Sequence, residues 1–365
     1  MKIIRYGLML VGAVILLLAL FIVKTLWVAG EFKDLIPHET GQYKSVSSLA
    51  GAEDITVDPS TGTAFISCND RRAAMRGEKK QGAIYAYDLK AANPAPVSIT
   101  ESVRFRFHPH GISFFAAPNG KKMLFVVNMG HDAHFHDSSQ NGTIEIFEYS
   151  GSRLIHRQTI ADSKLHSPND ILGVGEKQFY VTNDHGATSR LGKMAEDYLQ
   201  LSWAHVLYYD GSGFSKAAED LSYANGIATS PDGSAVYVTS TVKGYLRIFS
   251  RDPSTGVLSR QEDIQLGTGL DNIEVDETGS LWIGCHPKLL TFVKHSKDPA
   301  VRSPSQVLRV RIGENKVHEI EEIYLNDGVA LSGSSVAMRY RNRLLIGSVY
   351  EHFLDGVLPE KFDAS

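Results

Sequence analysis

A pattern that recurs six times along the chain constrains the fold more than any other feature of the sequence. Each copy has two polar or small residues before an apolar residue, and a short apolar run follows further along. The leading apolar residues are Ile55, Ile112, Ile171, Ile227, Ile273 and Val336. Repeats of this size that are made of short strands are typical of propeller blades. The sequence therefore predicts an all-β fold, a six-bladed β-propeller.

The residue pairs in front of these apolar positions predict where the functional site lies. In a propeller the first strand of each blade lies nearest the axis, so the ends of these strands meet in the central channel. We therefore expect the six pairs to converge although they are far apart in sequence. The pairs are Glu53-Asp54, His110-Gly111, Asn169-Asp170, Asn225-Gly226, Asp271-Asn272 and Ser334-Ser335.

Oxygen donors dominate these pairs and predict a cation site. A first set combines carboxylates with neutral amides, which suits calcium and its roughly 6–8 oxygen ligands, whereas zinc prefers His and Cys. This set is Glu53, Asn169, Asn225, Asp271 and Asn272. Asp54 and Asp170 lie one residue along, where a regular strand points side chains the other way. They could hold a second ion with a backbone carbonyl of the second repeat. A turn or strand-end cap is the alternative for each residue taken singly.

His110 is the residue that would face the first ion from the second repeat. A histidine is a poor calcium ligand, but it can take a proton from water while a cation polarises a carbonyl group. That chemistry predicts hydrolysis of an ester or a lactone, and the sequence has no G-x-S-x-G motif of the serine esterases. A structural histidine in the channel is the alternative.

The N-terminus predicts a membrane anchor. Residues 7–28 are apolar except for Lys24, and a bilayer core needs roughly 20 helical residues. Lys2 and Arg5 before this run predict that the N-terminus stays in the cytoplasm and the rest lies outside it or in a secretory lumen. A cleaved signal peptide is the rival interpretation. The run has no polar face, which argues against a buried core helix. We expect an anchor at 1–28, a linker and ring-closing segment at 29–50, and the propeller at 51–365.

Other segments predict smaller features. Residues 43–48 could add the strand that closes the ring, and residues 191–203 predict a short helix over one face. Residues 69–81 are basic and are expected to form a loop at the channel mouth. Cys68 and Cys285 fall in blades that are not neighbours, so a disulfide is not expected. The net charge of −4 gives no electrostatic footprint for nucleic acid.

A loop after the second apolar run has an unusual composition. Residues 129–142 hold His131, His134 and His136, with Asp132 and Asp137 among them. Such a cluster can bind a transition metal, and a solvated polar loop is the alternative.

Taken together, these motifs resemble the serum paraoxonase/arylesterase family over nearly the whole chain after about residue 40. They are GAEDI, PHGIS, PNDI, TNDH, YANGI, DNI and LWIGCHP, at residues 51–55, 109–113, 168–171, 182–185, 223–227, 271–273 and 281–287. The resemblance implies a six-bladed propeller with two calcium ions in its channel. It also implies hydrolysis of lactones, aryl esters and, in some members, organophosphates, with an N-terminal helix that holds the protein on a lipid surface.

The resemblance also assigns roles to residues. It implies that the first oxygen set binds a catalytic calcium, and that Asp54, Asp170 and the Ile112 carbonyl bind a structural one. His110 matches the family's base. His185, Tyr223 and His286 match positions along the substrate channel.

Two departures from the family pattern affect the expected site. The family's second dyad histidine directly follows the Val-Val-Asn motif, but Met129 stands there in this chain and His131 comes two residues later. Either His131 takes that role or the dyad is absent. The cysteines of the family's ring-closing disulfide are also missing.

Three functions are consistent with these observations. We expect a calcium-dependent lactonase/arylesterase that acts on a small-molecule lactone or ester, with the membrane as its other partner. A strictosidine-synthase-like or sugar-lactone propeller enzyme is one alternative. A non-catalytic, calcium-stapled propeller anchored to a membrane is the other.

Overall fold

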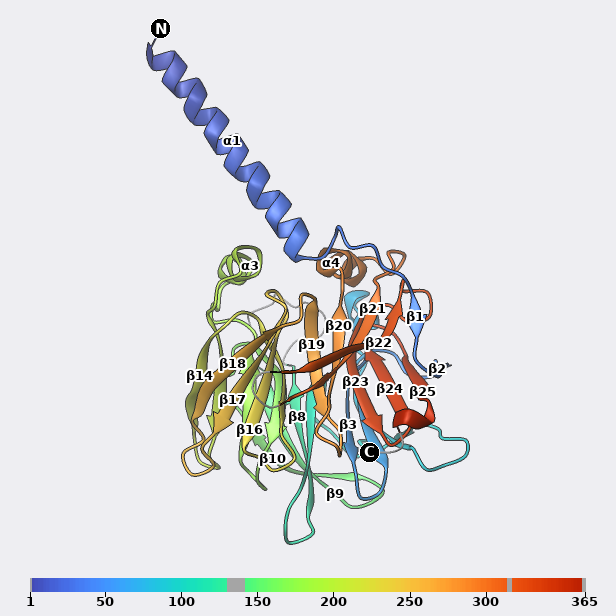
Figure 1. Cartoon of the computed structure of the whole chain (residues 1–365). Helices are drawn as coiled ribbons and strands as arrows, with labels where there is room; N and C mark the ends of the chain where they lie inside the picture. Colours follow the sequence, from blue (N-terminus) through green and yellow to red (C-terminus); the bar gives the residue numbers. More distant parts are fainter. Residues whose placement is uncertain (1, 130–141, 314–316, 363–365) are drawn as a thin grey trace.

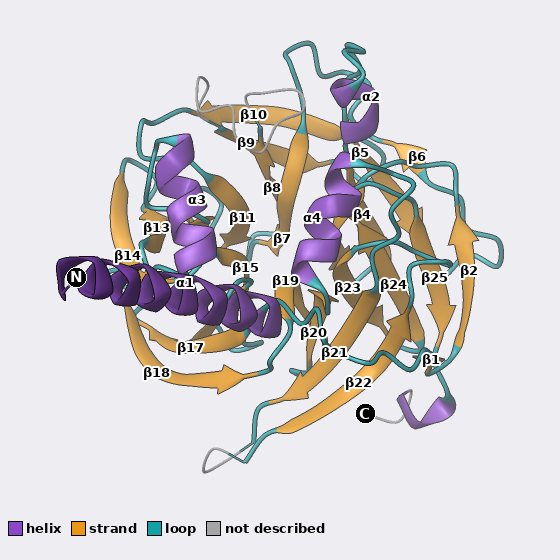
Figure 2. Ribbon diagram, turned by 90° about the horizontal axis from the view of Figure 1, so that it is seen from above, coloured by secondary structure: helices purple, strands orange, loops and turns teal. Residues whose placement is uncertain are grey.

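A computed structural model describes residues 2–129, 142–313 and 317–362 of the chain. Six antiparallel sheets surround a central axis, as the repeat predicts (Figure 1 and Figure 2). Within each sheet the strands pair mainly in chain order, so every repeat forms one blade. The fold is the expected six-bladed β-propeller.

The first three blades hold twelve strands in chain order. They are β3 (Ala52–Asp58), β4 (Thr63–Cys68), β5 (Ala83–Asp88) and β6 (Val97–Ser98); β7 (Pro109–Ala116), β8 (Lys122–Asn128), β9 (Thr143–Tyr149) and β10 (Leu154–Ile160); and β11 (Pro168–Gly173), β12 (Phe179–Asn183), β13 (Ala204–Tyr209) and β14 (Phe214–Leu221).

The last three blades include two strands from the N-terminal segment, β1 and β2. The strands are β15 (Ala224–Thr229), β16 (Ala235–Ser240), β17 (Tyr245–Arg251) and β18 (Leu258–Gln265); β19 (Gly269–Val275), β20 (Leu281–His286), β21 (Ser305–Arg311), β22 (Glu319–Asn326) and β1 (His38–Glu39); and β23 (Ser334–Tyr340), β24 (Arg343–Ser348), β25 (Phe353–Val357) and β2 (Gln42–Val46).

The N-terminal segment closes the ring by strand pairing. β2 pairs with β25 of the last blade, as the sequence predicts for residues near 43–48. β1 also pairs with β22 of the fifth blade, which the sequence did not predict. Both cysteines are free and buried, so backbone hydrogen bonds hold the closure and no disulfide does.

The core lies between the blades. Buried apolar side chains form six clusters, and each cluster joins two neighbouring blades. Burial of a Leu, Ile or Val side chain contributes about 1.5–3 kcal/mol, so the interfaces between blades stabilise the ring. The inner strand β3 is buried along its whole length because it packs against neighbours on both sides.

Four α-helices and one short 3₁₀ helix accompany the blades in the described chain. Their bounds are α1 (Lys2–Val28), α2 (Arg71–Met75), α3 (Arg190–Leu199), α4 (Leu289–Lys297) and η2 (Glu360–Phe362). The α-helices gather at one face of the propeller (Figure 2). α3 confirms the expected helix, although it ends at Leu199, before Gln200, which adopts a left-handed conformation with φ of 56°.

Two helices correct the expectation from sequence. The loop predicted over 69–81 contains α2, because the Asp70 side chain accepts a hydrogen bond from the Ala73 N–H and caps the first turn. α4 was not predicted, although the run Leu289-Leu-Thr-Phe-Val follows directly after Pro287 and Lys288.

α1 projects away from the propeller (Figure 1). The segment Ile3–Val28 is long and apolar enough to cross a membrane, and none of its most apolar stretch is buried. A buried core helix is therefore inconsistent with the structure. Such a helix suits a membrane anchor, and an N-terminal signal sequence has the same character.

Candidate metal and active site

The innermost strand of every blade is irregular at the residue pair that the repeat singles out. The register of each first strand against the second shifts after Ala52, Pro109, Pro168, Ala224, Leu270 and Ser334. Bulges of this kind bend a strand and redirect its side chains. In each blade a bulge therefore sets the direction of the side chains of the pair, and the regular alternation expected from the sequence does not.

Two glycines of these pairs allow neighbouring blades to approach closely. A Cβ atom on Gly111 would lie 2.6 Å from the Asp170 Cα and the Asn169 carbonyl oxygen. A Cβ atom on Gly226 would lie 2.6 Å from the Ile273 nitrogen and 2.8 Å from the Asp271 carbonyl oxygen. Because no side chain fits there, the second and fourth blades need glycine beside the polar residues of the third and fifth.

Three amide oxygens of the predicted ligand set are buried and without a hydrogen-bond partner in the described chain. They are the Oδ1 atoms of Asn169, Asn225 and Asn272. A buried acceptor left unpaired costs about 1–3 kcal/mol. These oxygens are therefore suited to a ligand that accepts their lone pairs.

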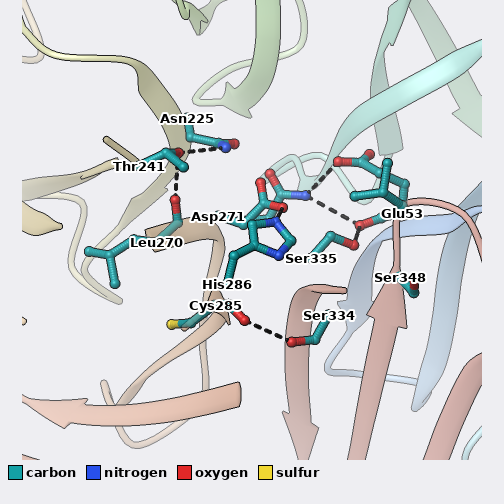
Figure 3. A network of polar contacts seen from close by, with 12 residues as sticks. Glu53, Asn225, Thr241, Leu270, Asp271, Cys285, His286, Ser334, Ser335 and Ser348 are labelled. Atoms are coloured by element: carbon teal, nitrogen blue, oxygen red, sulfur yellow. Dashed lines mark hydrogen bonds and ion pairs between the residues drawn. The ribbon is translucent and has the colours of Figure 1, made fainter. Parts of the chain in front are cut away.

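The amino group of each of these amides is held by a neighbour. Asn272 donates through Nδ2 to Glu53 Oε1 at 2.9 Å, and Asn225 donates to Thr241 Oγ1 at 3.0 Å. Asn169 makes a longer contact of 3.4 Å with Asp184 Oδ2. Asn225, Asp271 and Glu53 come from three different blades and lie around the same part of the channel (Figure 3). The amino contacts fix which way the free oxygens point.

The donor chemistry of this set fits calcium. No group of three or more His, Cys, Asp or Glu side chains lies close enough to hold a metal in the described ranges, so a thiolate- or imidazole-rich site is not formed there. Two carboxylates, Glu53 and Asp271, instead stand among neutral amide oxygens. Calcium favours such a mixture of oxygen ligands.

The second predicted pair of carboxylates connects neighbouring blades. Asp54 accepts hydrogen bonds from the backbone N–H groups of Ile55 at 2.9 Å and Ile112 at 2.6 Å. Asp170 accepts from Ile171 at 2.7 Å and Ile227 at 2.8 Å. Each carboxylate thus binds its own strand and the bulge of the next blade.

These carboxylates also repel one another. Burial, and then the charge of Glu53, raise the pKa of Asp54 well above its ordinary value. Burial and Asp54 do the same to the pKa of Asp170. Glu274 joins this group, since burial and Asp54 raise its pKa as well. Glu274 lies on β19 and was not predicted from the sequence. A cation beside Asp54 and Asp170 would relieve the repulsion between them.

His110 contacts both a carboxylate and a guanidinium group. Its Nδ1 atom is 3.0 Å from Glu53 Oε2 and 2.7 Å from Arg71 Nη2. A guanidinium only donates hydrogen bonds and a carboxylate only accepts them, so the two contacts require different tautomers of His110. Burial alone would raise the pKa of Glu53, but His110, Arg71 and Asn272 together lower it.

Arg71 contacts His110, although the sequence predicts only a basic loop at this position. It is the first residue of α2, and its side chain is buried. Nη1 donates to the Val349 carbonyl at 3.0 Å, which ties α2 to the last blade. The cap at Asp70 is the sequence signal that could have placed this arginine on a helix.

The three predicted channel residues lie in two places. His286 Nε2 is 2.8 Å from Asp271 Oδ2, and its ring stacks on Phe292 of α4. His185 and Tyr223 contact each other edge to face, with ring centroids 5.0 Å apart.

His185 has carboxylates on both sides. Its Nδ1 lies 2.6 Å from Asp184, and its Nε2 lies 3.0 Å from Asp197 of α3. Burial disfavours the charged ring, but Asp184 and Asp197 outweigh it and raise the pKa of His185 to about 10. With both ring nitrogens engaged, His185 is not a free base. His131, His134 and His136 lie outside the described residues.

Comparison with known proteins identifies the relatives of this chain. The arylesterase family model matches residues 50–356. Serum paraoxonase/arylesterase 2 of Rattus norvegicus is 36% identical over 83% of this chain and 85% of its own length. Human serum paraoxonase/lactonase 3 is 34% identical over 84% of this chain and 85% of its length.

Solved structures show the same fold at greater distance. The PQQ-bound aldose sugar dehydrogenase of Streptomyces coelicolor superposes with a TM-score of 0.53 at 12% identity, over 89% of this chain and all of that one. Such a likeness concerns the propeller alone. The family model and the sequence relatives carry the assignment: this chain belongs to the serum paraoxonase/arylesterase family.

Proposed function

We propose that the protein is a calcium-dependent hydrolase of lactones and aryl esters. One observation carries the proposal. Three buried amide oxygens, of Asn169, Asn225 and Asn272, have no partner in the described chain. Asn272 bonds to Glu53, whose other oxygen lies 3.0 Å from His110 Nδ1. The names of the relatives, arylesterase and lactonase, support the same substrate class.

The first oxygen set, Glu53, Asn169, Asn225, Asp271 and Asn272, would hold the catalytic ion. Bound calcium would polarise the carbonyl group of the substrate and offset the negative charge that develops on its oxygen. Asp54, Asp170 and the Ile112 carbonyl would hold a second, structural ion. The mutual repulsion of the buried carboxylates supports that second site.

His110 is proposed as the general base. In the tautomer that donates Nδ1–H to Glu53, the Nε2 lone pair is free to take a proton from water. The water oxygen then bonds to the carbonyl carbon, and the same proton can pass to the departing oxygen. Glu53 would keep the ring in this tautomer, in which Nδ1 cannot also accept a hydrogen bond from Arg71. His131 remains the predicted second histidine.

His286, His185 and Tyr223 are proposed to shape the channel around the substrate. His286 would hold Asp271 in place, because Nε2 can donate to that carboxylate. The pairing of His185 with two carboxylates supports a positioning role for this residue.

We further propose that α1 anchors the enzyme in a membrane with the propeller outside the cytoplasm. Residues 1–28 would form the anchor, residues 29–50 the linker and ring closure, and residues 51–365 the propeller. Exposed apolar residues of α3 lie on the same face as α1 and favour contact with a lipid surface; they are Leu191, Met194, Tyr198 and Leu199.

Hydrolysis assays test the proposal directly. The full chain in detergent would be given aliphatic lactones, aromatic lactones and phenyl acetate, with calcium and again after chelation. Calcium-dependent turnover is expected. Absence of turnover from a folded, calcium-loaded protein would contradict the proposal and favour a non-catalytic propeller. Turnover of sugar lactones alone would favour the other propeller enzymes.

A further inference from the structure

A cavity of about 410 Å³ lies where the apolar helix meets the propeller. Trp27 and Val28 from the last turn of α1 form one wall, and Phe32 and Lys33 follow directly after the helix. The opposite wall comes from the segments after β16 and β18, and it includes Lys243. The cavity is therefore apolar toward the helix and basic toward the propeller.

Neither lysine of this cavity forms a salt bridge with a described residue. Lys33 Nζ donates to the Gly267 carbonyl at 2.8 Å, and Lys243 Nζ donates to Ser202 Oγ at 2.8 Å. No acidic side chain belongs to the described residues that line the cavity. Both partly buried lysines of the cavity lining thus donate to neutral oxygens.

The charges around the lysines favour an anion in this space. Burial lowers the pKa of Lys33, and Cys285 and Glu322 only partly offset this. Burial, Arg247 and Lys24 lower the pKa of Lys243, and Asp263 only partly offsets this. Because an anion between the two groups would reverse these effects, the cavity suits a negatively charged ligand.

The position of the cavity indicates where that ligand comes from. A helix that crosses a bilayer places its ends at the level of the lipid headgroups, where Trp is enriched. Trp27 stands at that end of α1, and 73% of its surface is exposed. If α1 spans the membrane, as proposed above, the cavity opens at headgroup depth.

We propose that this cavity binds the phosphate headgroup of an anionic phospholipid. The phosphate would lie between Lys33 and Lys243, and the glycerol and first acyl carbons would pack on Trp27 and Phe32. A zwitterionic lipid is disfavoured, because the described lining offers no carboxylate to its cationic group. The protein would thereby bind anionic membrane surfaces preferentially, in addition to being anchored in the membrane.

Thermal unfolding of the full chain in detergent tests this site. The probes are dioctanoyl phosphatidylglycerol, dioctanoyl phosphatidylcholine and inorganic phosphate at equal concentration. Phosphatidylglycerol is expected to raise Tm by about 5 °C near saturation, and the other two probes are expected to leave Tm unchanged. An equal shift with phosphatidylcholine would overturn the charge selectivity, and an equal shift with phosphate would overturn the lipid as ligand.

Matched variants locate the effect. K33Q/K243Q is expected to lose the phosphatidylglycerol shift. K90Q/K177Q is expected to keep it, because those exposed lysines lie in the turns after β5 and β11, at the far ends of the blades. Persistence of the shift in K33Q/K243Q would place the lipid elsewhere and refute the proposal.

An activity control separates this proposal from the proposed function. Neither Lys33 nor Lys243 belongs to the candidate metal and active site, so K33Q/K243Q is expected to hydrolyse phenyl acetate in detergent at the wild-type rate. Should the chain hydrolyse nothing, the lipid shift can still be measured. A lower activity together with a lower Tm in this variant would show a folding defect. In that case the milder variant K33R/K243R must keep the phosphatidylglycerol shift for the proposal to stand.

Discussion

Glu53 Oε2 lies 3.0 Å from His110 Nδ1, so the first two blades bring a proposed calcium ligand and the proposed base into contact. The residues are far apart in sequence, but each stands on the bulge of an innermost strand. One carboxylate can therefore serve two functions. Its Oε1 accepts from Asn272, and its Oε2 faces the imidazole.

Replacement of His110 with glutamine should remove the base and leave the oxygen set intact. Loss of a general base typically lowers the rate by about 10²–10⁴-fold. We expect a fall of this size in kcat for phenyl acetate, while the rise of Tm on adding calcium stays as in the wild type. H38Q is the control, because His38 is exposed on β1. Full activity in H110Q would contradict the assigned role.

Replacement of Asn272 with alanine should weaken calcium binding. The variant loses one unpaired oxygen and the hydrogen bond to Glu53. A ligand at 100 times its Kd stabilises a protein by about 2.7 kcal/mol, so wild-type Tm should fall clearly on chelation. In N272A, a much higher calcium concentration should be needed to raise Tm by the same amount. N93A, in an exposed loop, should behave as the wild type, and an unchanged calcium titration in N272A would remove Asn272 from the ligand set.

A methyl group at Gly111 should disturb the site through packing alone. The new Cβ would overlap Asp170, and relief of such overpacking typically costs about 1–3 kcal/mol. We expect G111A to unfold at lower denaturant concentration and to bind calcium more weakly. G213A is the matched control, because a Cβ atom there meets no atom within 4 Å. Equal stability of the two variants would show that the blades can separate at no cost.

The sequence predicted those parts of the fold that follow from local periodicity. The six repeats, the strand at 42–46 and the helix at 190–199 are confirmed. β1 was missed because two exposed residues, His38 and Glu39, have no periodic pattern. α2 was missed because it is only five residues long and its helical signal is a single cap at Asp70.

Within the site, the repeat predicted which residues meet but not their partners. Arg71 reaches His110 from a helix that no repeat position marks, so the composition of the loop alone could not place it. Asp184 lies in the connection between β12 and α3, and Asp197 lies on α3 itself. Their contacts with His185 therefore depend on how α3 packs against the propeller. Tertiary packing decides both contacts.

The pairing of His185 with Asp197 predicts a pH-dependent attachment of α3. The folded protein holds the pKa of His185 at about 10, above the value of about 6.5 expected in the unfolded chain. A raised pKa stabilises the fold fully below about pH 6.5, and the stabilisation is lost as pH rises through about 10. The Tm difference between wild type and H185Q, measured from pH 6 to pH 10.5, should therefore shrink with rising pH. Other titrating groups affect both proteins alike and cancel in this difference. A constant difference over the range would mean that His185 is not charged in the folded protein.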